Sequence, residues 1–138
     1  MTFQVMGRNE APRASYRTLP ERTVIISIAD VDQEPVRFAK NPHILAICRV
    51  HFDDVDRGQP NCITREDAIQ IRDFMRAHPK AEHVLVHCEA GVSRSAGAAA
   101  ALMKYYTGCD AAIFDHPRFR PNMSVYRMVL NACFEEDF

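Results

Sequence analysis

The chain has 138 residues, of which 47% are hydrophobic and 25% are charged, and its formal net charge is −1. This length suits one domain with its own hydrophobic core, and the composition is that of an ordinary globular protein. The absence of a basic excess argues against a dedicated nucleic-acid binder. No apolar run approaches the roughly 18 residues of a membrane-spanning helix, so we expect no membrane span.

The cysteines argue against a disulfide-bonded secreted protein and against a metal-binding domain. Their number, five, is odd, and none of them stands in a Cys-x-x-Cys pair or at another metal-like spacing. No secretory signal is visible at residues 1–4, so a reducing, cytoplasmic setting is expected. We expect neither a metal nor another cofactor, and we expect a monomer.

Three apolar runs predict buried strands. Residues 1–22 mix Arg, Pro and polar residues with a few large apolar side chains, which predicts an irregular or short-strand entry. The β-branched run 23–29 predicts the first clear strand, and the run 44–52 predicts the second. The run 83–86 predicts the third strand.

Helices are predicted between and after these strands. Residues 65–77 carry apolar side chains on one face and follow a threonine suited to cap a helix. A long Ala-rich segment ends next to Gly108, a favourable residue for a helix C-terminus. A short helix is predicted for residues 109–114, and a last helix begins at Asn122 as its N-cap.

Strands that alternate with helices predict an α/β fold. We expect a single domain, residues 1–138, with a central, mostly parallel sheet and helices on both of its faces. Open α/β sheets bind their ligands at the carboxyl ends of the strands. The residues that follow the strand at 83–86 are therefore expected to form the functional site.

The segment after that strand has the pattern of a phosphate-binding loop. An apolar run ends at Cys88, Arg94 follows, and the Ala-rich helix comes next. Unpaired backbone N–H groups and the helix dipole favour an anion at such a junction. We call residues 88–94 the phosphate loop. The backbone N–H groups expected to hold phosphate belong to Glu89, Ala90, Gly91, Val92, Ser93 and Arg94.

The side chains of the phosphate loop supply the chemistry. A free cysteine has a pKa of roughly 8.5, and a helix N-terminus with Arg94 nearby favours the nucleophilic thiolate of Cys88. Arg94 offers a planar fork of donors that matches two phosphate oxygens. Gly91 allows tight backbone curvature. Ser95 either caps the helix or donates a hydrogen bond to the sulfur, and His87 supports the loop from below.

The order His87-Cys88, five residues, and Arg94-Ser95 resembles the signature of the protein tyrosine phosphatase superfamily. The short chain and the late cysteine are similar to its compact dual-specificity branch, including small bacterial and phage-type members. The segment 118–122, Arg-Phe-Arg-Pro-Asn, resembles the region before the last helix of that branch. The resemblance implies hydrolysis of a phosphate monoester in two steps, through a phosphocysteine and without a metal.

Such hydrolysis needs a carboxylic acid that protonates the leaving oxygen. The candidates are Asp53, Asp54 and Asp56. In the family, apolar residues stand four and two positions before the acid, and Val50 and Phe52 stand at these offsets from Asp54. We therefore assign Asp54. The alternative is Asp56, because the residues after it resemble the acid-bearing loop of other small members.

Two further positions are compared with the family. Glu89 stands where relatives often carry a neutral or basic residue, and there it either weakens the attraction for anions or points to solvent. Cys48 is expected to be a buried, inert thiol. The alternative is an oxidised pair between Cys48 and Cys88, as in some relatives.

The expected function is that of a cysteine-dependent protein phosphatase, whose partner is a phosphorylated protein or peptide. Phosphotyrosine is the expected substrate, with phosphoserine and phosphothreonine as further candidates. Two alternatives stay open: a phosphatase for an RNA 5′ end, a lipid or a small metabolite, and a module that binds phosphorylated partners without turnover. The near-neutral charge disfavours RNA and lipid, and the intact Cys88 and Arg94 disfavour the binding module.

Overall fold

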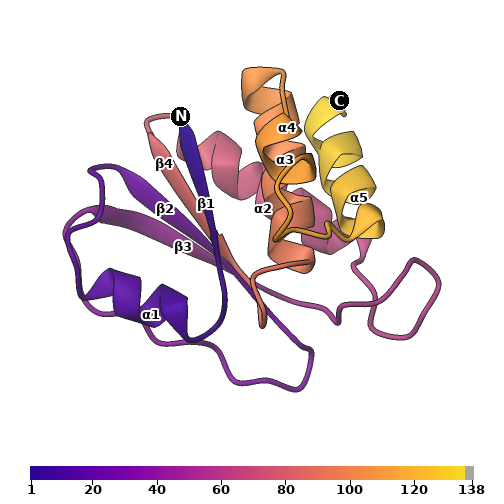
Figure 1. Ribbon diagram of the computed structural model, residues 1–138, viewed down its shortest axis with the longest axis horizontal. Coiled ribbons are helices and arrows are strands. Elements are labelled where there is room, and N and C mark those ends of the chain that lie inside the picture. The colour runs from indigo at the N-terminus through magenta and orange to yellow at the C-terminus, as the bar shows by residue number, and fades with distance from the viewer. Residues whose placement is uncertain (136–138) are drawn as a thin grey trace.

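The computed structural model describes residues 1–135 as one α/β domain (Figure 1). Within these residues the sheet consists of four strands: β1 (Thr2–Met6), β2 (Thr23–Ala29), β3 (Ile44–His51) and β4 (His83–His87). They lie in the order β1-β4-β2-β3, and every neighbouring pair is parallel. The predicted α/β fold with a parallel sheet is therefore confirmed.

Helices cover both faces of the sheet. Within residues 1–135 they are α1 (Glu10–Ser15), α2 (Arg65–Ala77), α3 (Arg94–Thr107), α4 (Ala111–Phe114) and α5 (Met123–Phe134). Helices α2, α3 and α5 lie on one face, and the short α1 lies on the other (Figure 1). None of these helices is long and apolar enough to cross a bilayer.

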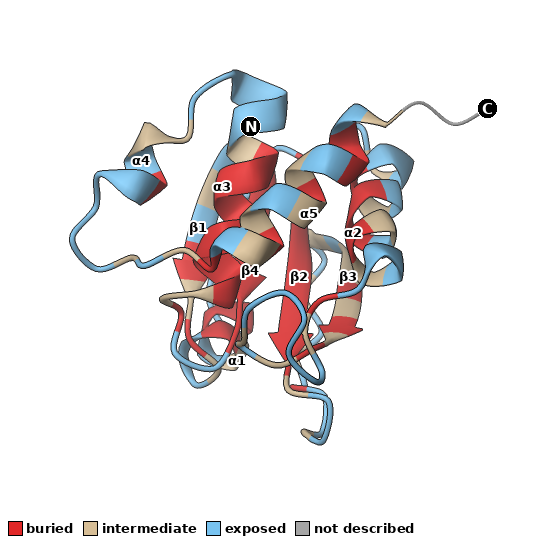
Figure 2. Cartoon of the chain, turned by 90° about the vertical axis from the view of Figure 1, so that its right-hand side faces the viewer, coloured by how far each residue is buried: buried red, intermediate tan, exposed pale blue. Residues whose placement is uncertain are grey.

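The central position of β2 explains why its sequence is apolar throughout. All seven of its residues are buried, because β4 and β3 flank it and helices cover both faces. Val24, Ile26 and Ile28 pack into the larger core beneath α2, α3 and α5, whereas Ile25 packs into the smaller core beneath α1. In Figure 2, β2, β4 and the first turns of α3 are coloured as buried.

Local sequence signals set the helix ends where they were predicted. Thr64 caps α2: its hydroxyl accepts the N–H of Asp67 (3.1 Å), and the Asp67 carboxylate accepts the N–H of Thr64 (2.9 Å). Gly108 ends α3 in the left-handed conformation (φ 82°), which a residue without a Cβ adopts at low cost. Asn122 caps α5 by accepting the N–H of Val125 (3.2 Å).

The N-terminal segment is more ordered than its composition predicted, because it forms β1 and α1. Strand β1 pairs with β4 so that Met6 lies opposite His87. The contact continues beyond the strands, where the N–H of Cys88 donates to Met6 O (3.4 Å) and the N–H of Arg8 donates to Glu89 O (2.9 Å). The end of β1 therefore supports the start of the phosphate loop.

Close packing between the phosphate loop and the end of β1 requires a glycine. Gly91 has a φ of +70°, and a Cβ at this position would lie 2.5 Å from the backbone N of Gly7 and 2.5 Å from the carbonyl carbon of Met6. Gly108 has a similar φ of +82°, but a Cβ there would meet nothing within 4 Å. The same left-handed backbone is thus crowded at Gly91 and open at Gly108.

We expect Gly91→Ala to lower the free energy of unfolding by about 2–5 kcal/mol, because left-handed strain adds to overpacking. Gly108→Ala is the matched control and should cost only the strain, about 1–2 kcal/mol. Denaturant unfolding of both variants measures the difference. Equal losses in the two variants would contradict the crowding at Gly91.

Candidate active site

The loops that follow β4, β2 and β3 meet at one edge of the sheet, because parallel strands place their carboxyl ends together. The phosphate loop follows β4, Asp30 follows β2, and the acidic stretch that contains Asp53 and Asp54 follows β3. This is the lower edge of the sheet in Figure 1. The candidate site is built from these loops.

The phosphate loop presents free backbone donors. Within residues 1–135, none of the backbone N–H groups of residues 89–94 donates a hydrogen bond to another protein group. Arg94 is the first residue of α3, so the helix dipole adds positive potential at the same point. A curved row of unpaired N–H groups at a helix N-terminus is suited to hold a tetrahedral anion.

Cys88 lies at the base of this loop. The residue is 2% exposed, and its Sγ lies 3.0 Å from Ser95 Oγ. Ser95 is fully buried in the first turn of α3. The structure thus places Cys88, Ser95 and the loop amides next to one another.

The guanidinium of Arg94 is buried and is held through one nitrogen. Its Nη1 donates to Asp30 Oδ1 (2.6 Å) and to Phe52 O (2.7 Å). Its Nε is buried and has no hydrogen-bond partner within residues 1–135. A planar guanidinium held in this way keeps the edge that carries Nε for the oxygens of a phosphate.

Asp30 is a site residue that the sequence reasoning missed. Its side chain is 36% exposed, whereas the side chain of its partner Arg94 is 4% exposed. The carboxylate offsets the charge of the buried guanidinium and sets its orientation. The available signal was the place of Asp30 directly after a buried strand, at the edge where parallel sheets bind ligands.

His87 supports the phosphate loop from below, and its partners define its tautomer. Its Nδ1 lies 3.3 Å from Cys88 O, and its Nε2 lies 2.6 Å from Ser27 Oγ. Because a carbonyl only accepts, Nδ1 carries the proton, and Nε2 accepts from Ser27. Burial, with a smaller effect from nearby arginines, lowers the pKa of His87 to about 4, so the ring is neutral near pH 7.

Asp54 lies against the phosphate loop. Its Oδ1 accepts hydrogen bonds from Ser93 Oγ (2.8 Å) and from the side-chain amide of Asn122 (2.9 Å). Its Oδ2 has no hydrogen-bond partner in the described part of the chain. This second oxygen is therefore available to carry a proton to a substrate.

The other two candidate acids lie differently. Asp53 accepts from the N–H of Val31 (3.1 Å) and from the amide of Asn61 (3.3 Å), so it joins neighbouring loops. Asp56 is exposed, and no hydrogen bond holds its side chain within the described residues. It lines the same pocket, of about 380 Å³, as Asp54. The contacts with the phosphate loop favour Asp54 over Asp56.

Asn122 joins the acid, the phosphate loop and α5. Besides capping α5, its amide donates to Asp54 and to Val55 O (3.2 Å), and its backbone N–H donates to Ser93 O (3.0 Å). Helix α3 can pass this close because it carries Gly97, where a Cβ would lie 2.6 Å from Asn122 O. The sequence predicted Asn122 as a helix cap and as part of the segment 118–122 that resembles the family, but it did not indicate the contact with Asp54.

Glu89 is tied to the turn that follows β2. Its Oε2 accepts a hydrogen bond from the side-chain amide of Gln33 (2.9 Å). The carboxylate is exposed, and its N–H remains available to the phosphate loop. Of the two expectations for Glu89, the outward orientation fits better.

Cys48 is too far from β4 to pair with Cys88 in this fold. Cys48 lies opposite Ile26 of β2, and Ile26 lies opposite Val86 of β4. Two strand spacings of about 4.8 Å therefore separate Cys48 from β4, which is more than a disulfide spans. Burial raises the pKa of Cys48 to about 11, as fits an inert thiol.

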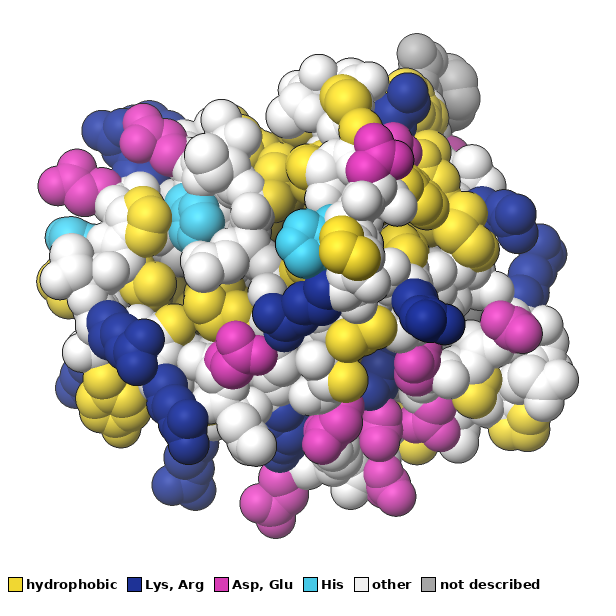
Figure 3. All heavy atoms as spheres, in the orientation of Figure 1, with side chains coloured by type: hydrophobic (Ala, Val, Ile, Leu, Met, Phe, Trp, Pro, Cys, Tyr) yellow, Lys and Arg dark blue, Asp and Glu magenta, His cyan; other side chains and the backbone are white. Residues whose placement is uncertain are grey.

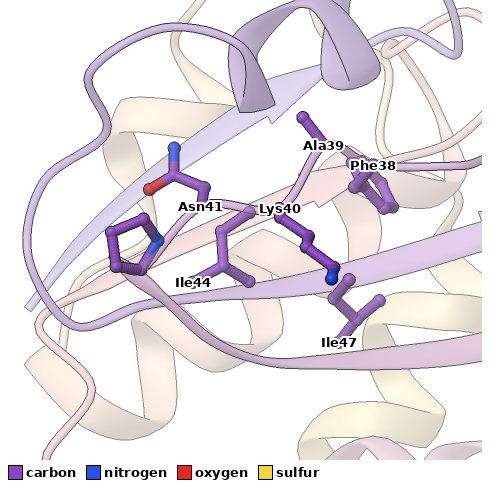
Figure 4. Close-up of a pocket in the computed structure, with 7 residues that line it drawn as sticks. Phe38, Ala39, Lys40, Asn41, Ile44 and Ile47 are labelled. Atoms are coloured by element: carbon purple, nitrogen blue, oxygen red, sulfur yellow. The ribbon is translucent and has the colours of Figure 1, made fainter.

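A larger pocket, of about 580 Å³, lies away from these groups (Figure 4). Its lining includes Phe38, Ile44 and Ile47 but no cysteine, serine or threonine and no residue of the phosphate loop. It approaches the site through Phe38, whose ring packs edge-on against His87 (5.8 Å). Within the described residues, no group of three His, Cys, Asp or Glu side chains could hold a metal ion.

The fold is that of the compact dual-specificity branch of the protein tyrosine phosphatase superfamily, as the sequence resemblance predicted. Human DUSP28 is similar with a TM-score of 0.64 and 18% sequence identity, over 95% of this chain and 90% of its own. A mouse putative dual specificity phosphatase complexed with zinc tungstate is similar with a TM-score of 0.59 and 18% identity, over 91% and 78%.

A third similar structure is the human tyrosine phosphatase-like serine/threonine/tyrosine-interacting protein. Its TM-score is 0.55 at 19% identity, over 79% of this chain and 74% of its own. No model of a known protein family and no curated protein matches the sequence. At such identities the likeness establishes the fold, and the side chains of the site must support any activity.

We expect the free energy of unfolding to fall as the pH drops from about 6.5 to about 4. The pKa of His87 is lowered in the folded chain, so the unfolded chain binds the proton first in this range. A shift of this size corresponds to a loss of about 3 kcal/mol. Burial also lowers the pKa of His83, which adds a decrease of the same sign.

Unfolding of His87→Asn measured across this pH range tests the assignment. The Asn side chain can donate to Cys88 O but does not titrate, so we expect a shallower pH dependence than in the wild type. His116→Asn removes an exposed histidine and serves as the matched control. An unchanged pH dependence in His87→Asn would contradict the prediction.

Proposed function

We propose that the chain is a cysteine-dependent protein phosphatase that hydrolyses phosphotyrosine, and also phosphoserine and phosphothreonine, through a phosphocysteine intermediate. The observation that carries the proposal is the position of Cys88 at the base of a loop whose N–H groups are unpaired within residues 1–135. The unpaired Nε of Arg94 and the nearby Asp54 add the further groups that the reaction needs.

In the first step Cys88 Sγ attacks phosphorus, and the bond from phosphorus to the leaving oxygen breaks. Asp54 gives its proton to that oxygen, so the dephosphorylated residue leaves as an alcohol or phenol. The N–H groups of the phosphate loop and the guanidinium of Arg94 hold the other phosphate oxygens while charge shifts onto them. The product of this step is a phosphocysteine.

In the second step water attacks phosphorus, and the bond from sulfur to phosphorus breaks. Asp54, now ionised, accepts the proton of the water and is ready for the next cycle. Ser95 Oγ, 3.0 Å from the sulfur, donates to the departing thiolate. Inorganic phosphate then leaves the loop.

The position of Asp54 supports an enzyme over a module that binds phosphorylated partners without turnover. An ionised carboxylate beside a phosphate site repels the ligand, whereas a protonated one donates to its leaving oxygen. Arg94 is the one Lys or Arg in the phosphate loop. This single cationic side chain suits a monoester on a protein better than a multiply charged lipid head group.

We expect Cys88→Ser to lose detectable hydrolysis of p-nitrophenyl phosphate in the absence of added metal, because the covalent intermediate cannot form. Cys109→Ser, which removes an exposed thiol, should retain the wild-type rate. Hydrolysis that survives Cys88→Ser would exclude the covalent mechanism. Wild-type protein that binds a phosphopeptide and never releases phosphate would favour the binding module.

We expect Asp54→Asn to lower kcat for phosphotyrosine and phosphothreonine peptides by about 10²–10⁴-fold, because Asn cannot protonate the leaving oxygen. The loss should be smaller for p-nitrophenyl phosphate, whose leaving group departs readily as an anion. Asp53→Asn and Asp56→Asn are matched controls. A larger loss in Asp56→Asn than in Asp54→Asn would move the acid to residue 56.

A further inference from the structure

We propose a second anion subsite beside the phosphate loop, which takes a phosphate or carboxylate that the substrate peptide carries near the residue to be dephosphorylated. The subsite is a pocket of about 510 Å³ between the start of α1 and the segment after β2. Three arginines line it: Arg8, Arg13 and Arg37. The inference rests on the proposed function, because one peptide occupies both places.

The backbone places this pocket next to the nucleophile. Arg8 follows β1, and its N–H donates to the carbonyl of Glu89 (2.9 Å), the residue after Cys88. On the other side, the amide of Gln33 binds the Glu89 carboxylate (2.9 Å), and the next residue, Glu34, lines the pocket. The pocket therefore lies beside the phosphate loop, and one extended peptide can lie across both.

The positive charge of the pocket is not cancelled by ion pairs. Glu34 is the one acid in its lining, against three arginines. Glu10, at the start of α1, pairs instead with Arg118 (3.2 Å). Within residues 1–135, no ion pair joins a carboxylate to any of the three lining arginines. The pocket thus has a surplus of positive charge in a chain that is nearly neutral.

Arg8 also has an unused donor. Its Nη2 donates to Glu34 O (2.8 Å), which fixes the guanidinium against the pocket wall. Its Nη1 is buried and has no hydrogen-bond partner within residues 1–135. The side chains of Arg13 and Arg37 are exposed, so their planar guanidinium groups can turn toward a ligand. An anion in the pocket would offer acceptors to all three side chains.

The charge around the site is asymmetric. In Figure 3, Lys and Arg side chains gather at the lower left, where Figure 1 places α1. Asp and Glu side chains gather along the bottom, to the right of that cluster, where Figure 1 draws the first part of the segment after β2. A peptide with an acidic flank is therefore expected to lie with that flank toward α1.

The test compares peptides that carry one phosphotyrosine and differ at one further position. That position holds a neutral residue, a glutamate or a phosphoserine. Because an extended chain advances about 3.3 Å per residue, the position is placed up to about four residues to either side of the phosphotyrosine. We expect the second anion to raise kcat/KM about fivefold to tenfold, mainly through KM. The gain should shrink as salt is added. The glutamate and phosphoserine peptides distinguish a carboxylate from a phosphate.

Two variants locate the effect. Arg13→Gln with Arg37→Gln should remove the preference for the second anion and leave hydrolysis of p-nitrophenyl phosphate unchanged. Arg22→Gln removes a charge at the amino end of β2, the opposite edge of the sheet, and should keep the preference. A preference that survives the double variant, or its absence in the wild type, would overturn the subsite.

Binding of the same peptides to Cys88→Ser, followed by fluorescence anisotropy, separates the two proposals. Tighter binding of the doubly charged peptides, lost with the two arginines, supports the subsite even when the wild type releases no phosphate. In that case the phosphatase proposal fails and the subsite stands. Equal binding of neutral and doubly charged peptides overturns the subsite even when the wild type is an active phosphatase.

Discussion

The orientation of one buried guanidinium is the constraint on which the site depends. A buried cation is costly unless it is paired and hydrogen-bonded, and Arg94 finds both partners at the ends of neighbouring strands: Asp30 after β2 and the carbonyl of Phe52 after β3. Because both partners bind Nη1, the Nε edge keeps its donor for a ligand. The hydrogen bonds that offset the cost of burying this charge therefore also set the orientation of the guanidinium.

The proposed acid depends on a different part of the chain. Asp54 belongs to an irregular stretch, and the side chains that hold it come from the phosphate loop and from the N-cap of α5. Asn122 accepts from α5 with its oxygen and donates to Asp54 with its nitrogen, so one side chain orients the helix and the carboxylate together. Any displacement of the C-terminal helix would therefore move the proton donor relative to the nucleophile.

The residues that determine the fold of this chain differ from those that determine the chemistry of its site. Similar structures share 18–19% identity with it, because the packing of an α/β sheet needs apolar residues of suitable size at buried positions and tolerates many choices. The site needs particular side chains at particular points. Two of the three arginines that line the proposed subsite, Arg8 and Arg13, come from the N-terminal segment, before the part of the sequence that resembles the family.

The sequence by itself determined the central strands, the capped helices and the phosphate loop, because each of these depends on residues that are neighbours in the chain. Cys88, Arg94 and Ser95 lie within eight residues of one another, and the apolar run before them and the Ala-rich helix after them are enough to place them. Only the tertiary structure decided three contacts of the site. They are the ion pair between Asp30 and Arg94, the hydrogen bond from Asn122 to Asp54, and the pairing of β1 that supports the phosphate loop. The partners in these contacts are 64, 68 and more than 80 residues apart, and they meet because parallel strands bring distant loops to one edge of the sheet.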